Sequence, residues 1–317
     1  MAGKSESETT RLDDAARAGW LYYVVGDTQD EIARKLGVSR QSAQRLVSLA
    51  VSEQLIKFRL DHPIARCMEL AQMIRDQYDL RMCEIVPSDP AAPFSIAGIA
   101  QAGAAEMERL LRSEEPKIIA FGTGRALRAC VEQLRPMECP HHTAVSLLGN
   151  MMLDGSATAY NVIIRFAERI NCRHFPMPLP PLARTAHERE LFQQQEPVKN
   201  ILEIAEKADV TFVGIGEIGE AAPMLVDGFI THDEIRALTA AGAVGEITSW
   251  VYDSSGELIK GLTNDRVTSA PLHADPDHLR CGIAAGMQKV KAIRAAMTGR
   301  LINGLITNEA TAEQLLK

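Results

Sequence analysis

The pattern of apolar and polar positions predicts a layered α/β structure for most of the chain. From about residue 80 onward, short apolar runs alternate with longer segments whose apolar residues recur at helical spacing. The runs predict strands at 82–86, 117–121, 144–148, 210–215, 247–252, 280–284 and 301–306. The segments between them predict helices at 96–112, 125–134, 157–170, 187–207, 233–241 and 287–298. Such alternation is typical of a mostly parallel sheet with helices on both faces.

A different pattern near the N-terminus predicts two short helices joined by a tight turn. Thr28 is a good helix N-cap, and Glu31 three residues later completes a capping box. Gly37 ends the first helix in the left-handed conformation that glycine adopts at little cost, and Ser39 caps a second helix. This arrangement predicts a helix-turn-helix. The alternative is a pair of amphipathic helices in a bundle, with the charges simply solvated.

The predicted second helix separates its side chains into a core face and a reading face. The core of the pair is expected to contain Ile32, Ala33, Leu36, Leu46, Val47, Ala50 and Val51. In a helix-turn-helix the second helix enters the major groove, where arginine suits guanine and glutamine suits adenine. The segment 55–60 alternates apolar and basic residues, as a wing strand near the DNA backbone would. The predicted DNA-binding residues are Thr28, Ser39, Arg40, Gln41, Gln44, Arg45 and Lys57.

A domain boundary is expected just before Pro63, because the residue before a proline is disfavoured in a helix. We therefore predict an all-α winged helix-turn-helix domain at 1–60 and a second domain at 61–317. Residues 1–60 hold nine basic and eight acidic residues, so their net charge is +1; the net charge of −7 for the whole chain leaves −8 for the rest. A helix at 64–78 would link the two domains. A bare interaction module that assembles through this helix is a further alternative.

Composition excludes several classes of protein. The chain has 317 residues, of which 46% are apolar and 24% charged, which is ordinary for a globular protein and unlike a disordered tail. No stretch approaches the roughly 20 consecutive apolar residues of a membrane-spanning helix, and the polar start does not resemble a signal peptide. We therefore expect a cytoplasmic protein. Its six cysteines lack CxxC spacing, and the adjacent histidines 141 and 142 are expected to point to opposite sides of a strand; no metal or cofactor is predicted.

Glycine-containing segments follow three of the predicted strands. They are 122–125, 149–150 and 214–217, and the first also opens a helix, where backbone N–H groups favour an anion. Each segment alone can be only a tight turn. Because the carboxyl ends of parallel strands meet at one edge of a sheet, the three together indicate a single binding crevice.

In order along the chain, these segments resemble a known family. The predicted helix-turn-helix at 28–46 is followed by Phe-Gly-Thr-Gly at 121–124, Ala-Val-Gly-Glu-Ile at 243–247, Asp-Ser-Ser-Gly at 253–256, Ala-Ala-Gly-Met-Gln-Lys at 284–289 and Leu-Ile-Thr-Asn-Glu-Ala-Thr-Ala at 305–312. This order resembles the SorC (sugar-binding, DeoR-related) family of bacterial transcriptional regulators. The resemblance implies a C-terminal Rossmann-like parallel sheet of the sugar-phosphate-isomerase type, which also mediates oligomerisation. It further implies a homotetramer, a dimer of dimers, whose affinity for operator DNA changes when a sugar or sugar phosphate binds.

The resemblance also implies a set of effector contacts at the strand ends. Those residues are Gly122, Thr123, Gly124, Arg125, Gly149, Asn150, Gly214, Gly216, Glu217, Asp253 and Lys289. The chain departs from the family's Gly-Gly at 285–286, which is Ala-Gly here, and from its Thr-Asp-Glu at 307–309, which is Thr-Asn-Glu here. The second departure removes a carboxylate. The effector is therefore expected to be a sugar, a sugar alcohol or a sugar phosphate.

We thus predict a DNA-binding regulator of a bacterial carbohydrate or polyol operon, with no catalytic residues. The alternative is an enzyme, a sugar-phosphate isomerase or deaminase with an appended helical domain. Such an enzyme needs a general base and a ring-opening acid at the crevice. The candidates would be Asp227, Asp253, Glu246 and His232.

Overall fold

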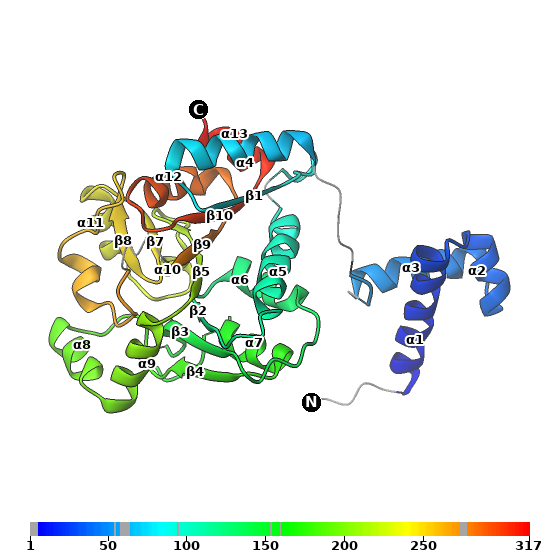
Figure 1. Cartoon of the computed structure of the whole chain (residues 1–317), viewed down its shortest axis with the longest axis horizontal. Helices are drawn as coiled ribbons and strands as arrows, with labels where there is room; N and C mark the ends of the chain where they lie inside the picture. Colours follow the sequence, from blue (N-terminus) through cyan, green and yellow to red (C-terminus); the bar gives the residue numbers. More distant parts are fainter. Residues whose placement is uncertain are drawn as a thin grey trace. The chain divides into compact units, whose positions relative to one another are not determined.

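A computed structural model describes residues 6–53, 55–57, 64–93, 95–152, 154–158, 160–272 and 278–317. The chain divides into two compact units, residues 1–62 and residues 63–317. Figure 1 shows the elements of each unit, which we describe separately. Within the described ranges, every helix falls short of the length and apolar character that a membrane span requires.

The first unit consists of three α-helices and a short π-helical segment. They are α1 (Glu6–Trp20), the π-helix Leu21–Val25, α2 (Gln29–Leu36) and α3 (Arg40–Ser52). Helix α1 packs against α3, and the buried core contains Ala18, Leu21, Ile32, Ala33, Ala43 and Val47. The predicted helix-turn-helix is confirmed, and a preceding helix that the sequence pattern did not predict completes its core.

The structure corrects two expectations for this unit, and part of the second falls on residues that it does not describe. Val51 was expected in the core, but it is 39% exposed. It lies in the last turn of α3, on the side of the helix that faces solvent. In the predicted wing segment, residues 55–57 form a bend rather than a strand, and Ile56 packs beside Gly19 and Ala50. Residues 58–60 lie outside the described part of the chain.

A parallel sheet of seven strands forms the centre of the second unit. Its strands are β1 (Met82–Val86), β2 (Ile118–Phe121), β3 (Thr143–Gly149), β4 (Arg173–Met177), β5 (Val210–Gly214), β9 (Leu279–Ile283) and β10 (Gly304–Asn308). Their spatial order is β1-β10-β9-β5-β2-β3-β4, and every neighbouring pair is parallel. The predicted α/β fold is confirmed.

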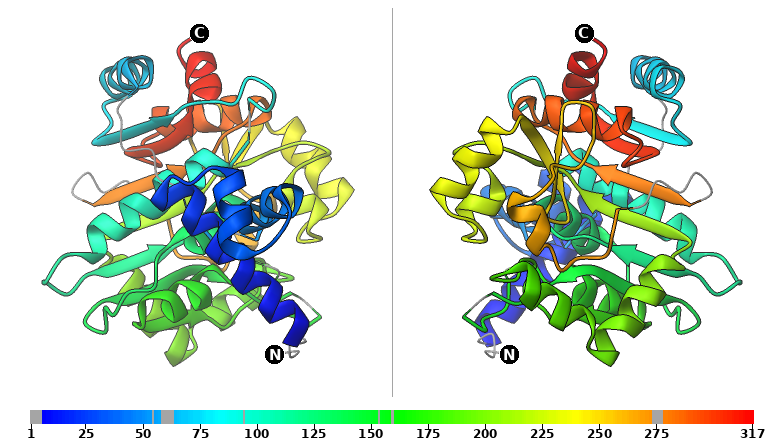
Figure 2. Two further views of the ribbon diagram at one scale, coloured as in Figure 1. Left: turned by 90° about the vertical axis from the view of Figure 1, so that its right-hand side faces the viewer. Right: turned by 90° about the vertical axis from the view of Figure 1, so that its left-hand side faces the viewer.

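Helices cover both faces of this sheet. The α-helices of the second unit are α4 (Ala65–Tyr78), α5 (Ala97–Leu111), α6 (Arg125–Gln133), α7 (Val162–Ile170), α8 (Ala186–Gln193), α9 (Glu196–Glu206), α10 (Pro223–Val226), α11 (His232–Ala240), α12 (Val290–Thr298) and α13 (Glu309–Leu315), and seven of them pack on this sheet. Helices α5, α6 and α7 pack on one face around a core that includes Phe121, Phe166 and Phe212. Helices α4, α9, α12 and α13 share the core of the other face. Figure 2 shows α13, in red, beside α4, in blue-cyan, in both of its views.

A small antiparallel sheet lies beside the carboxyl ends of the parallel strands. It contains β6 (Gly216–Glu217), β7 (Ala243–Ile247) and β8 (Trp250–Asp253) in the order β6-β7-β8. Helices α10 and α11 contribute Met224, Ile235 and Leu238 to a separate core against it. Because β6 follows β5 after a single residue, this sheet begins at the strand end where the crevice was predicted.

Several element predictions differ from the structure. The apolar run 247–252 is not one strand: β7 ends at Ile247 and β8 begins at Trp250, with a two-residue turn between them. The predicted helix 187–207 is two helices, separated at residues 194–195, and the helix expected from residue 157 begins at Val162. Strands β4, β6 and most of β7 were not predicted; β4 lies at the edge of the sheet, where its Arg173 and His174 are exposed and break the apolar pattern.

Candidate functional site

A cavity of about 410 Å³ opens at the carboxyl ends of β2, β3, β5 and β9. Small-molecule sites typically have volumes of about 300–1,000 Å³ and occur at such strand ends in open α/β sheets. Eight of the eleven residues predicted to contact an effector line it: Thr123, Gly124, Arg125, Gly149, Gly214, Gly216, Glu217 and Lys289. The crevice predicted from three glycine-containing segments is therefore one physical cavity. The binding role of the individual residues stays a prediction.

The structure does not bring the other three predicted residues into the cavity wall. Gly122 packs beneath it, where an added Cβ would lie 3.2 Å from Cγ2 of Thr248. Asn150 accepts a backbone hydrogen bond from Thr158. Asp253 lies at the far end of β8, where its carboxylate accepts hydrogen bonds from the N–H and hydroxyl of Ser255 and from the N–H of Glu257. Asp253 thus stabilises a turn outside the cavity.

Lys289 places an ammonium group among acids in the cavity. Its Nζ donates a 2.7 Å hydrogen bond to the backbone oxygen of Ile215 and lies 3.8 Å from Oε2 of Glu217. Burial lowers the pKa of Lys289, and the charge of Arg125 lowers it further, whereas Glu217 and Glu246 act in the opposite direction. The lysine is therefore a partly desolvated cation that is available to a ligand oxygen.

Glu246 is a buried carboxyl group on β7 in the wall of the cavity. Its Oε2 accepts a 2.9 Å hydrogen bond from the N–H of Ser249, and burial raises its pKa. The close approach of β6 explains why residue 216 is glycine: an added Cβ would overlap Oε1 of Glu246. The glycine at this position therefore makes room for a carboxylate rather than for a ligand.

Tyr160 and Asp227 form a hydrogen-bonded pair in the cavity wall. The hydroxyl of Tyr160 donates to Oδ2 of Asp227 at 2.7 Å. Burial, together with this carboxylate, raises the pKa of Tyr160 to about 12, and the nearby Arg125 partly opposes the increase. The phenol therefore remains a hydrogen-bond donor at neutral pH.

The turn between β7 and β8 adds two residues with unusual backbone angles. Thr248 has a φ of 50° and Ser249 a φ of 72°. Positive φ at both central positions is characteristic of a type I′ hairpin turn, which normally uses Asn-Gly. A β-branched residue in the left-handed region is a genuine outlier. Both residues line the cavity, and the hydroxyl of Thr248 is buried without a hydrogen-bond partner.

Sequence reasoning missed much of the polar lining. The predicted effector set lacks Thr158, Tyr160, Asp227, Glu246, Thr248, Ser249 and Gln288, all of which line the cavity. Asp227 and Glu246 had been considered only as acid–base candidates of an enzyme. The other two such candidates are elsewhere: Asp253 in its turn, and His232 at the exposed start of α11, where it contacts Glu220. The Ala-Val-Gly-Glu-Ile motif was a usable signal for Glu246.

The adjacent histidines have a structural role. They do not point to opposite sides of a strand as expected, because they lie in a turn before β3 and their rings are 4.0 Å apart. His141 contacts the backbone oxygen of Ser113, and the buried His142 contacts that of Leu111 while its Nδ1 accepts from the N–H of Lys117. Across the described ranges, no group of three or more His, Cys, Asp or Glu side chains is arranged to hold a metal ion.

The helix-turn-helix of the first unit is formed by local capping interactions. Thr28 and Glu31 form the complete capping box of α2, and the side chain of Ser39 accepts from the N–H of Ser42 at the start of α3. Gly37 has a φ of 68° between the two helices. The hydroxyls of Thr28 and Ser39 are therefore engaged in helix caps, which leaves them a positioning role.

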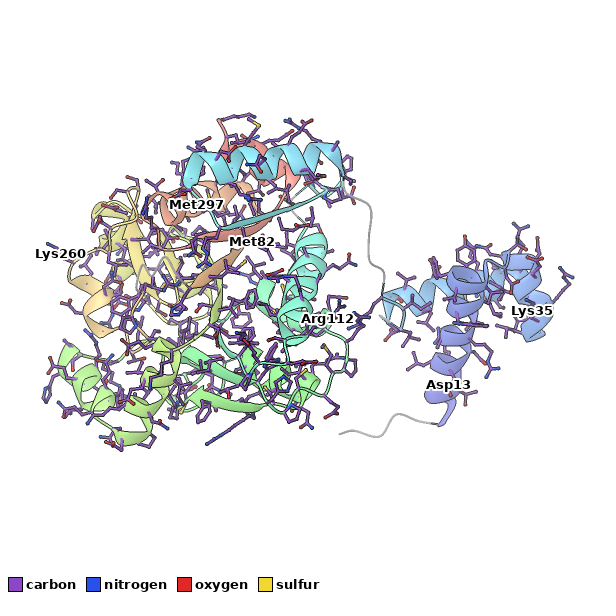
Figure 3. The ribbon with its side chains drawn as sticks, viewed as in Figure 1. Asp13, Lys35, Met82, Arg112, Lys260 and Met297 are labelled. Carbon is purple, nitrogen blue, oxygen red and sulfur yellow. The ribbon has the colours of Figure 1, made fainter. Side chains whose placement is uncertain are left out.

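The predicted reading face of α3 is exposed. Arg40, Gln41, Gln44 and Arg45 all have exposed side chains, and Nε of Arg40 lies 3.5 Å from Asp30. Lys57 is exposed as well. On the neighbouring helix, Lys35 projects outward, where it bonds to Asp27 at 2.6 Å (Figure 3). The face thus presents two guanidinium groups and two amides to solvent.

Comparisons with known proteins cover almost the entire chain. The family model described as "Putative sugar-binding domain" matches residues 62–317. The erythritol catabolism regulatory protein EryD of Brucella abortus is 31% identical over 95% of this chain and 96% of its own length, and the transcriptional regulator LsrR of Escherichia coli K12 is 28% identical over 99% and 97%. The full-length sorbitol operon regulator SorC of Klebsiella pneumoniae superposes with a TM-score of 0.70 at 26% identity, covering 97% of this chain and 100% of that protein.

This chain aligns with these regulators over nearly their whole length, and the resemblance inferred from its motifs is confirmed. The chain belongs to the SorC family of transcriptional regulators, with a C-terminal sugar-binding domain.

Proposed function

We propose that this regulator binds a small polyhydroxylated effector in the cavity at the carboxyl ends of β2, β3, β5 and β9. The observation that carries the proposal is the convergence of eight motif residues on one cavity of about 410 Å³ within a sugar-binding domain. Acidic, basic and hydroxyl side chains all line its wall, which suits a ligand with several hydroxyls. The effector is a polyol or sugar, either free or as its phosphate monoester.

The cavity offers partners for both forms of the effector. Arg125 is the first residue of α6, and the backbone N–H groups at the start of that helix favour an anion. Lys289 adds a second cation, while Glu217 and Asp227 offer carboxylates that accept hydrogen bonds from ligand hydroxyls. Gly124, whose missing side chain would face open space, allows the ligand to approach the backbone.

The first unit, which ends near Pro63, binds operator DNA in this proposal. Arg40, Gln41, Gln44 and Arg45 read base edges and hold phosphates, while Thr28 and Ser39 fix the positions of α2 and α3. Lys57 contacts the DNA backbone. Because the protein acts on operator DNA, its site of action is the cytoplasm.

The effector acts by changing how subunits are arranged. We propose a homotetramer formed through residues 63–317, in which paired recognition helices match paired operator half-sites. An effector that prefers one arrangement by about 1–3 kcal/mol changes operator affinity about 5- to 150-fold. No chemical conversion of the effector is part of this function.

The proposal is tested with purified full-length protein and the DNA upstream of its own gene. Erythritol, sorbitol and their monophosphates are first screened for an increase in melting temperature, since a ligand that binds only the folded state stabilises it. Hits are then added to a DNA-binding titration, and the ligand is recovered and checked by NMR. We expect one compound to change DNA affinity and to be recovered intact. Turnover of the compound without an effect on DNA would instead establish the enzyme alternative.

A further inference from the structure

Two buried polar atoms in the cavity wall have no hydrogen-bond partner. Among the described residues, six buried side-chain atoms are unpartnered: Arg189 Nε, Glu217 Oε2, Thr248 Oγ1, Thr263 Oγ1, Ser269 Oγ and Thr307 Oγ1. Glu217 and Thr248 line the cavity and the other four residues do not. A buried polar group without a partner is costly, and each such group in a folded protein calls for an explanation.

Glu217 is held close to a cation without a hydrogen bond to it. Its Oε2 lies 3.8 Å from Nζ of Lys289, which is beyond hydrogen-bond distance, while that ammonium donates to the backbone oxygen of Ile215. The carboxylate therefore has charge compensation and retains its capacity to accept hydrogen bonds. The unpartnered Oε2 of Glu217 therefore favours a hydroxyl donor at this point over an anionic group, which it would repel.

Thr248 combines an unpartnered hydroxyl with a strained backbone. The side chain is 6% exposed, and the residue is in the left-handed region at a turn position where asparagine is usual. Strain of this kind persists where the surrounding structure enforces it, and it concentrates at ligand-binding sites. Nothing in the packing of the hairpin requires a hydroxyl here, since Oγ1 makes no hydrogen bond to the protein.

We infer that Glu217 and Thr248 form a subsite for an uncharged hydroxyl-bearing part of the effector, in which the carboxylate of Glu217 and the hydroxyl of Thr248 hydrogen-bond to neighbouring ligand hydroxyls. This inference rests on the proposed effector function of the cavity. It adds the chemical character of the group that binds here, namely a diol rather than a phosphate or a carboxylate. The unpartnered Oε2 of Glu217 accepts from one ligand hydroxyl, and the hydroxyl of Thr248 hydrogen-bonds to its neighbour.

Two variants remove these groups with little change in shape. Thr248→Val replaces the hydroxyl by a methyl group at the same branched position, and Glu217→Gln removes the charge. Thr263→Val is the matched control, because its hydroxyl is also buried and unpartnered but lies outside the cavity. Removing an unpartnered hydroxyl is expected to raise the melting temperature of the free protein by about 2–4 °C in both valine variants.

Binding is measured by calorimetry on the full-length protein, with erythritol and sorbitol as probes. The diol is tested with 1,2,4-butanetriol and 1,4-butanediol, which lack one and both inner hydroxyls of erythritol. We expect Thr248→Val to weaken probe binding about 3- to 10-fold and Glu217→Gln about 10-fold or more, while Thr263→Val binds as the wild type does. The loss caused by either cavity variant should vanish for 1,4-butanediol, because the missing hydroxyls leave nothing for the subsite to bind.

Two negative outcomes are distinguishable. If the wild type binds a probe and both cavity variants bind it as Thr263→Val does, the subsite is disproved and the effector function stands. If the wild type binds none of a panel of polyols, sugars and their phosphate monoesters, the proposed effector class is wrong and the subsite is rejected with it.

Discussion

The phenol of Tyr160 donates a 2.7 Å hydrogen bond to the carboxylate of Asp227, joining two segments 67 residues apart in the wall of the cavity. Tyr160 precedes α7, and Asp227 is the C-cap of α10. The bond therefore connects the helical layer on the main sheet with the smaller antiparallel subdomain.

We expect Tyr160→Phe to lower the stability of residues 63–317 by about 1 kcal/mol, because a half-buried bond to a charged acceptor is lost. Effector affinity should fall as well, since Asp227 is no longer held in place. Urea unfolding and calorimetry measure the two effects. Tyr22→Phe, on the exposed π-helical segment of the first unit, is the control. Unchanged unfolding of Tyr160→Phe would show that the two segments are held by packing alone.

Replacing Arg40 or Arg45 by alanine should weaken operator binding. A bidentate contact to a base contributes about 1–3 kcal/mol, so each change is expected to reduce affinity about 5- to 150-fold. A contact to phosphate would instead reduce the slope of log affinity against log salt by about one. Arg112→Ala, exposed on the second unit, serves as the control. Intact binding by the double variant in fluorescence anisotropy would refute the assignment of the reading face.

Gly149→Ala should strongly destabilise the second unit. An added Cβ would overlap the backbone oxygen of Leu179, which cannot move independently of its chain. We expect a loss of about 3 kcal/mol or more, seen as a fall in melting temperature of about 6–12 °C. Gly155→Ala is the comparison: Gly155 has a φ of 88° but open space around it, so only the backbone cost of about 1–2 kcal/mol applies. Equal losses in the two variants would contradict this explanation.

His142 should make stability fall at mildly acidic pH. Burial lowers its pKa below the ordinary 6.5, so between these values the unfolded chain binds a proton that the folded chain does not. Its contribution is complete above about pH 6.5 and decreases as the pH falls toward the lowered value. Urea unfolding between pH 5 and 8 should show a flatter dependence for His142→Gln than for wild type. The exposed His174→Gln should retain the wild-type slope; identical slopes for all three proteins would exclude this origin.

The elements that the sequence predicts well are those formed by interactions between residues close together along the chain. The helix-turn-helix was located from Thr28, Gly37 and Ser39, because caps and left-handed stops depend on residues three or four positions apart. The strands at β1, β2, β3, β5 and β9 were found within one or two residues, since buried parallel strands are continuous apolar runs. The hairpin at Thr248 was missed because its turn lacks the usual Asn-Gly, and an apolar run continues through it.

The amino-acid sequence by itself determined the two-part organisation, the capped helix-turn-helix, the α/β class and the family, since all of these depend on local signals and on their order along the chain. The tertiary structure alone decided which side chains meet. It brought Tyr160 to Asp227, placed Glu217 beside Lys289 and left Thr248 without a partner, and it removed Asp253 from the site. The reason is geometric: parallel strands collect their carboxyl ends at one edge, but the path of each following loop depends on packing against segments far away in the chain.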